Sequence, residues 1–170
     1  MSAYFGDYKN LQPLWVADMD LRTPDFITQA MNEKIQHGIF GYTRPTKTLI
    51  DAGVKWMKDR HNYTIKEEYL TFVNGVVPAY SAAIEAFSNE GDEVIVQTPA
   101  YYPFFNHIKS NNRVLVANQL KETNGYYTMD LKDLESKITS KTKILVLCSP
   151  HNPVGRVWNK EELSALAKIC

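Results

Sequence analysis

From Leu70 onward, short apolar segments alternate with stretches of helical length, and this alternation constrains the fold more than any other feature of the chain. Four segments rich in branched and aliphatic residues are predicted strands: 70–73, 93–97, 114–118 and 143–148. The segments predicted to be helical between them are 78–87, 102–109 and 131–137. Strands separated in this way pair in parallel, because an antiparallel hairpin needs only a short turn. The sequence therefore predicts an α/β fold, with a mostly parallel sheet and flanking helices.

Two further helices are predicted before this alternation begins. The first starts at Thr23, with Pro24 at the first helical position, and its apolar residues recur at helical spacing until Gly38. The second runs over 46–59. Its predicted buried stripe consists of Leu49, Ile50, Val54 and Met57.

The last residues have the pattern of a helix that does not end. Asn159 is a predicted N-cap, with Glu162 three residues later, and an apolar stripe continues to Cys170 without glycine, proline or a basic last turn. We expect the chain to be truncated within this helix.

Composition excludes several classes of protein. Hydrophobic residues make up 44% of the chain and charged residues 22%, which is typical of a globular protein. Nineteen basic residues balance nineteen acidic ones, which argues against binding to nucleic acid or to a membrane surface. No apolar run is long enough to span a bilayer. The two cysteines, Cys148 and Cys170, form no disulfide framework, so we expect a cytoplasmic protein.

The first of three unusual loops follows the predicted strand 70–73. It contains Gly75, Val76 and Val77 and opens a helix, whose free backbone N–H groups can hold an anion such as phosphate. A plain glycine turn explains the same residues. Neither a GxGxxG fingerprint nor a GxxxxGK[ST] loop occurs, so the sequence does not indicate nucleotide binding.

The second loop places aromatic residues between two prolines. Proline restricts the backbone, so Tyr101, the aromatic nearest the strand, can serve as a stacking platform for a planar ligand. Phe104 and Phe105 are predicted core residues, and all four aromatics of the loop could be core.

The third loop spans 148–156 and contains Asn152 between His151 and a proline. A residue before proline avoids the α region and can take a cis peptide bond, which would direct the Asn152 amide into a cleft as a hydrogen-bond donor. A structural turn is an equally good explanation. His151 could be a general base, although a lone histidine in a turn is more often a hydrogen-bonded spacer. No HExxH, CxxC or GxSxG motif occurs, so neither a metal site nor a serine-hydrolase site is predicted.

Five segments in this order resemble the fold-type I pyridoxal-5′-phosphate enzymes, and most closely the MalY/PatB branch of cystathionine β-lyases, also called C-S lyases. The resemblance covers nearly the whole chain. The segments are LWVADMD (14–20), HGIFGYT (37–43), NGVVPAYSAAIEAF (74–87), EGDEVIVQTPAYYPFF (90–105) and ILVLCSPHNPVGRVW (144–158).

The resemblance implies a role for each loop. The backbone of residues 75–77 would take the cofactor phosphate, Tyr101 would stack on the pyridine ring, and Asn152 would hydrogen-bond its phenolic oxygen. Tyr42 would reach the phosphate of the neighbouring subunit in a homodimer. Ala17 and Asp18 would contact the amino-acid substrate, although aspartates placed like Asp18 and Asp20, before a helix start, are usually turn formers.

The implied reaction is α,β-elimination from L-cystathionine or another cysteine conjugate, which gives a thiol, pyruvate and ammonia. An aminotransferase of the same fold is the alternative, and a noncatalytic regulatory or binding module is an alternative of another class. Residues 1–45 would form an N-terminal arm and first helix, and residues 46–170 part of the large, cofactor-binding domain.

The resemblance also implies what the chain lacks. The Schiff-base lysine of the family, the acid that pairs with the pyridine nitrogen and the arginine that binds the substrate carboxylate all follow the position of Cys170. No catalytic residue is therefore assigned within the chain. We expect the 170 residues alone to bind the cofactor at most noncovalently and to turn over no substrate.

Overall fold

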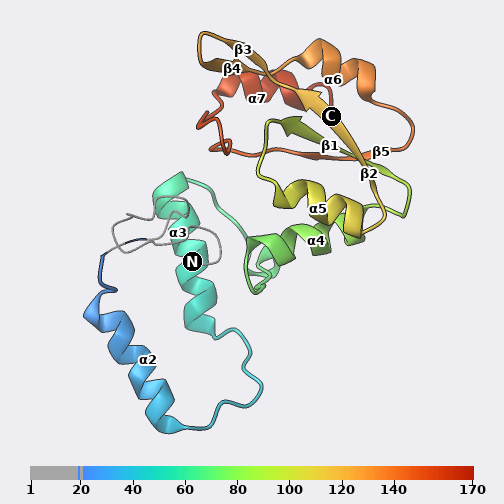
Figure 1. The fold of residues 1–170 in the computed structure, drawn as a ribbon. Helices are drawn as coiled ribbons and strands as arrows, with labels where there is room; N and C mark the ends of the chain where they lie inside the picture. Colours follow the sequence, from blue (N-terminus) through green and yellow to red (C-terminus); the bar gives the residue numbers. More distant parts are fainter. Residues whose placement is uncertain (1–18, 20) are drawn as a thin grey trace, which may run out of the picture. The chain divides into compact units, whose positions relative to one another are not determined.

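The computed structural model describes residue 19 and residues 21–170, which divide at Ile65 and Lys66 into two compact units. The second unit is built on a three-stranded parallel sheet in the order β2-β1-β5 (Figure 1). Its strands are β1 (Glu93–Thr98), β2 (Val114–Gln119) and β5 (Thr142–Val146). The parallel α/β arrangement predicted from the alternating pattern is confirmed.

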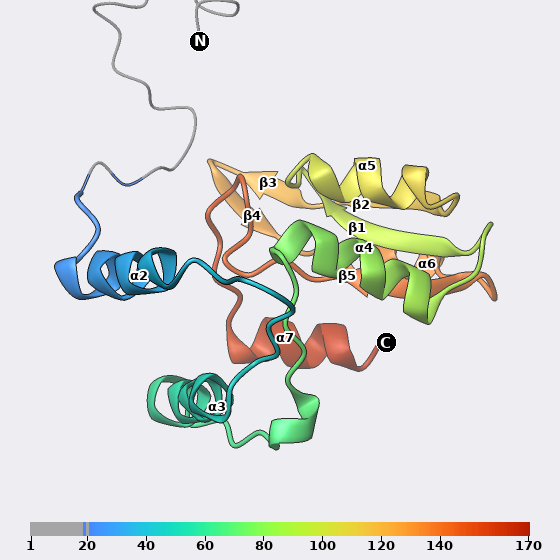
Figure 2. The same ribbon diagram turned by 90° about the horizontal axis from the view of Figure 1, so that it is seen from below.

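Helices cover both faces of this sheet (Figure 2). Residues of β1 alternate between two buried clusters, as the period of a strand requires. Val94 and Val96 pack with Ile84 and Ile108 of α4 (Val76–Phe87) and α5 (Pro103–Ser110). On the opposite face, the cluster consists of Ile95 with Leu134 of α6 (Leu131–Lys137) and Leu166 of α7 (Lys160–Ala167).

The end of α7 differs from the prediction. Its N-terminus has the predicted capping box between Asn159 and Glu162. The helix ends at Ala167, however, rather than running to Cys170, and the last amides turn back to the Leu166 carbonyl oxygen. Within the described residues, no helix combines the length and the apolar character that a membrane span requires.

One prediction for the second unit was wrong. Residues 70–73 form no strand and instead follow a short 3₁₀ helix, η1 (Glu67–Tyr69). Strand-forming residues need a paired neighbour, and none of the described strands pairs with this segment. Between β2 and α6, Asn124 and Gly125 form the turn of a hairpin of β3 (Lys121–Thr123) and β4 (Tyr126–Thr128).

The first unit contains α2 (Asp25–His37) and α3 (Lys47–His61), close to the predicted positions. Pro24 occupies the N-cap of α2 rather than its first turn, and Gly38 ends the helix with φ 74°. The prediction of a buried stripe on α3 was wrong, because neither helix has a buried residue. Helical periodicity marks an apolar face, but burial needs a partner surface as well.

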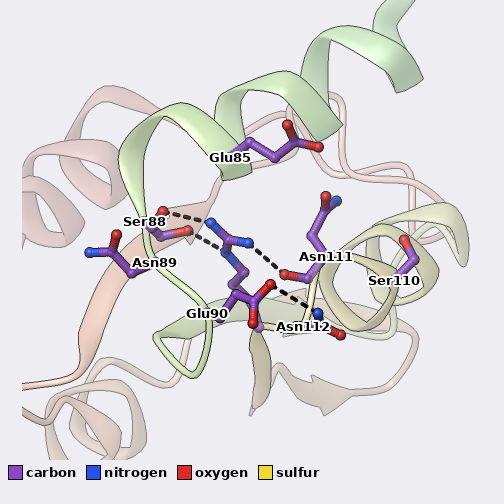
Figure 3. A pocket seen from close by; sticks show the side chains of 8 residues that line it. Glu85, Ser88, Asn89, Glu90, Ser110, Asn111 and Asn112 are labelled. Carbon is purple, nitrogen blue, oxygen red and sulfur yellow. Dashed lines mark hydrogen bonds between the residues drawn. The ribbon is translucent and has the colours of Figure 1, made fainter.

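Side chains close the end of the sheet where the strands begin. Arg113 lies just before β2, and its guanidinium donates to Ser88 Oγ at 3.0 Å, to the Ser88 carbonyl oxygen at 2.6 Å and to the Asn111 carbonyl oxygen at 2.6 Å. These bonds join the residues that directly follow α4 and α5, around a polar hollow (Figure 3). This end of α4 therefore lies at the amino ends of the strands.

Candidate functional site

The loops after β1 and β5 leave the same edge of the sheet, because these neighbouring strands are parallel. Ligands of open α/β sheets bind beyond this carboxyl edge. The first residues of α4 lie at this edge as well: Tyr80 packs against Phe104, which follows β1. The three loops singled out in the sequence are thus gathered at one edge.

The N-terminus of α4 has the features of an anion site. Gly75 is the N-cap, with φ 110° and ψ 162°, a conformation that side chains rarely allow. No side chain caps the helix, and the N–H groups of Val76 and Val77 belong to the first turn, which has no intrahelical acceptors. The positive end of the helix dipole adds to the attraction for a negative group.

Tyr101 is held by its aromatic neighbours. Its ring lies edge-on to Phe104, with centroids 5.8 Å apart and an interplanar angle of 88°. The residue is 37% exposed, so part of its surface remains free to contact a ligand. Phe104 and Phe105 pack against the first core cluster, as predicted.

Tyr80 links the α4 loop to the Tyr101 loop, and the sequence analysis missed it. Its ring lies 5.1 Å from that of Phe104, and its hydroxyl donates to the Phe104 carbonyl oxygen at 3.4 Å. Burial raises the pKa of Tyr80 above its ordinary value, so the hydroxyl stays a neutral donor. The available signal was the helical spacing of Tyr80 four residues before the apolar Ile84.

Asn152 lies at the exposed tip of a short closed loop. The His151 amide donates to the Arg156 carbonyl oxygen at 2.7 Å, and the Gly155 amide donates to the His151 carbonyl oxygen at 2.7 Å. The Asn152–Pro153 peptide bond is cis. His151 is 1% exposed, and its Nε2 lies 2.9 Å from the Pro99 carbonyl oxygen. The spacer interpretation of His151 therefore fits its burial.

Arg156 fixes the other end of this loop. Its guanidinium donates to both carboxylate oxygens of Glu162 at 2.8 Å and also to the Tyr127 carbonyl oxygen, and it lies over the ring of Trp158. Burial raises the pKa of Glu162, but the Asn159 amide and the Arg156 guanidinium lower it by more, so its net pKa lies below the ordinary value. The sequence analysis quoted Arg156 only as part of the loop.

Not every predicted site residue belongs to the second unit. Tyr42 lies in the first unit, between α2 and α3, and is fully exposed. Ala17, Asp18 and Asp20 lie outside the described residues. The arrangement of the remaining residues, helix N–H groups, an aromatic ring and a side-chain amide, can hold a planar ligand that carries a phosphate.

Comparison with known proteins identifies the family. The model of the aminotransferase class I and II family matches residues 12–170. The chain belongs to this family. The family member cystathionine beta-lyase PatB of Bacillus subtilis is 46% identical over 159 residues, which cover 93% of this chain and 41% of PatB.

Solved structures show the same fold. Cystalysin from Treponema denticola, whose structure contains a pyridoxal 5′-phosphate cofactor, has a TM-score of 0.92 and 40% identity, covering 99% of this chain and 43% of that one. A pyridoxal-phosphate-bound C-S lyase from Staphylococcus hominis has a TM-score of 0.85 and 33% identity, covering 97% and 44%. The chain thus spans less than half the length of its relatives and has part of the fold-type I pyridoxal-phosphate transferase fold.

Proposed function

We propose that these residues form the cofactor-binding part of a pyridoxal-phosphate-dependent C-S β-lyase. The observation that carries the proposal is the gathering of the Gly75, Tyr101 and Asn152 loops at one edge of the sheet. The 46% identity to a cystathionine β-lyase supports the lyase activity. We propose α,β-elimination from L-cystathionine or a related cysteine conjugate for the complete protein.

The residues at this edge fit the chemistry of pyridoxal 5′-phosphate. The Val76 and Val77 amides would hold the phosphate, because the helix N-terminus offers donors with no competing side-chain cap. The partly exposed Tyr101 ring would stack on the pyridine. The Asn152 amide would donate to the phenolic oxygen.

The cofactor and the residues of the chain would have different roles in the reaction. When bound, the cofactor supplies an electron sink for bond cleavage in the amino-acid substrate. The chain's own residues would hold and orient the cofactor: the N-terminus of α4 would bind the phosphate, Tyr101 would fix the plane of the ring, and the Asn152 amide would stabilise negative charge on the phenolic oxygen by a hydrogen bond. We assign no proton transfer to these residues, and we propose that the 170 residues alone bind the cofactor noncovalently.

We also propose a homodimer, with Tyr42 reaching the phosphate in the neighbouring subunit. The fully exposed Tyr42 side chain and the absence of buried residues on α2 and α3 support this assembly. Ala17 and Asp18 would contact the small-molecule amino-acid substrate. The two cysteines are free, which supports a cytoplasmic location.

An aminotransferase is the second candidate, because the family is described by that activity. The complete protein separates the two. Incubation with cystathionine should release pyruvate without an added keto acid. Strict dependence on a keto-acid acceptor would show that the protein is a transaminase instead.

The cofactor site can be tested on the 170-residue chain with pyridoxamine 5′-phosphate. This compound is an amine, so it forms no Schiff base with lysine side chains. Titration followed by its fluorescence should show saturable binding that inorganic phosphate displaces. Asn152→Ala should weaken this binding by about ten-fold or more, the loss of one hydrogen bond to a charged group. Absence of saturable binding would refute the proposed site.

A further inference from the structure

His151 joins two of the loops at the carboxyl edge. Its side chain is 1% exposed, and its Nε2 lies 2.9 Å from the carbonyl oxygen of Pro99, a residue far away in the sequence. A carbonyl oxygen only accepts hydrogen bonds, so the hydrogen of the imidazole must be on Nε2. The bond therefore requires one particular tautomer of His151.

The two ends of this bond lie next to the two residues proposed to contact the cofactor ring. His151 precedes Asn152 directly, and its backbone closes the loop through hydrogen bonds with Gly155 and Arg156. Pro99 lies two residues before Tyr101, and the intervening Ala100 packs against the first core cluster. A shift of the imidazole would therefore move the Asn152 tip relative to the Tyr101 ring.

Few other contacts control the distance between the Asn152 loop and the Tyr101 loop. The pairing of β1 with β5 ends at Val96 and Val146, before either loop begins. Among the described residues, the bond from His151 to Pro99 is the one side-chain hydrogen bond that joins the segments 97–102 and 147–159. The ring of His151 also lies edge-on to buried Trp158, at 5.5 Å, which restricts its rotation.

We propose that His151 is a positioning residue: its Nε2–H to Pro99 carbonyl bond sets the position of the Asn152 amide relative to the Tyr101 ring. The proposal rests on the proposed cofactor site and adds a residue that does not itself touch the ligand. The burial of His151 excludes direct contact with a substrate in solution, and for this reason we do not assign it acid or base catalysis.

Two substitutions that both introduce a side-chain amide separate a positioning role of His151 from a packing role. His151→Gln retains an N–H donor with a reach close to that of Nε2, whereas His151→Asn shortens the donor by one methylene. Ile95→Val is the matched control, because it lowers stability in the core of the same unit without touching either loop. The probe is pyridoxamine 5′-phosphate, titrated by fluorescence against the 170-residue chain.

We expect His151→Asn to weaken binding by about five-fold, the loss of one hydrogen bond, and His151→Gln to stay within about two-fold of the unsubstituted chain. Ile95→Val should lower the melting temperature and leave the affinity unchanged. Equal affinities for the Asn variant and the unsubstituted chain would overturn the proposal, as would equal losses for the Asn and Gln variants.

Nuclear magnetic resonance of the ligand-free chain provides a readout that does not depend on binding. The ¹⁵N spectrum should show the His151 hydrogen on Nε2, and a hydrogen on Nδ1 alone would overturn the proposal. His151→Asn should shift the resonances of both Asn152 and Tyr101, and His151→Gln should restore them. An unchanged Tyr101 resonance would refute the coupling, whereas failure of the unsubstituted chain to bind the probe would refute only the proposed cofactor site.

Discussion

The two ends of the β2-β1-β5 sheet are built in opposite ways. At the amino end, side chains close the structure: Arg113 joins α4 to α5, and Glu93 accepts hydrogen bonds from Thr139 and Thr142. At the carboxyl end, Tyr101 and Asn152 remain exposed, and the hydrogen bond from His151 to Pro99 joins the loops that carry them. One end therefore uses its polar groups for internal bonds, while the other keeps donors and an aromatic surface available to a ligand.

The largest expected effect separates stability from binding at the amino end. Arg113→Ala removes three hydrogen bonds and leaves two carbonyl oxygens without their donor, so it should lower the free energy of unfolding by about 2 kcal/mol. Urea denaturation measures this loss. Arg113→Lys keeps the charge but not the forked geometry, and it should recover only part of the stability.

The same Arg113→Ala variant should bind pyridoxamine 5′-phosphate as well as the unsubstituted chain does, at a temperature where both are folded. A clear loss of affinity would mean that the two ends of the sheet are coupled. The functional division between them would then be wrong.

A smaller effect is expected at the carboxyl end, where a substitution should change ligand binding more than stability. Tyr101→Ala should weaken binding of pyridoxamine 5′-phosphate by about 1 kcal/mol, the typical contribution of an aromatic pair, because the pyridine ring of the ligand would lose the side chain on which it stacks. Fluorescence titration gives this value. Tyr101→Phe keeps the ring and should bind normally, so an equal loss in both variants would mean that the hydroxyl, and not stacking, holds the ligand.

The smallest expected effect is a change of the free energy of unfolding at low pH. The folded-state pKa of Glu162 is depressed, so its stabilising contribution is present above the ordinary carboxyl pKa and is lost as the pH falls through the folded value. The difference in unfolding free energy between the unsubstituted chain and Glu162→Gln should be below about 1 kcal/mol near neutral pH. Thermal unfolding should show this difference vanishing in acid, and a difference that grew in acid would contradict it.

The sequence predicted the elements that depend on local signals. The period of apolar residues located the strands β1, β2 and β5 and the helices α2 to α7, and the Asn159 capping box marked the start of α7. The three site loops were found because glycine, proline and aromatic residues at strand ends have specific backbone consequences.

Features that depend on contacts between distant segments were not predictable in this way. The segment 70–73 has strand-forming residues but no described strand beside it, and no residue of the α3 stripe is fully buried. Hydrogen bonds from Tyr80 to Phe104, from His151 to Pro99 and from Arg156 to Tyr127 join segments far apart along the chain. No local pattern specifies which partner such a side chain will meet.

Glu162 participates in two structures at once. One of its carboxylate oxygens accepts the Asn159 amide that begins α7, and both accept the guanidinium that anchors the Asn152 loop. Fraying of the first turn of α7 would therefore release the loop, and detachment of the loop would weaken the helix start. The helix and the loop should open together as one cooperative unit.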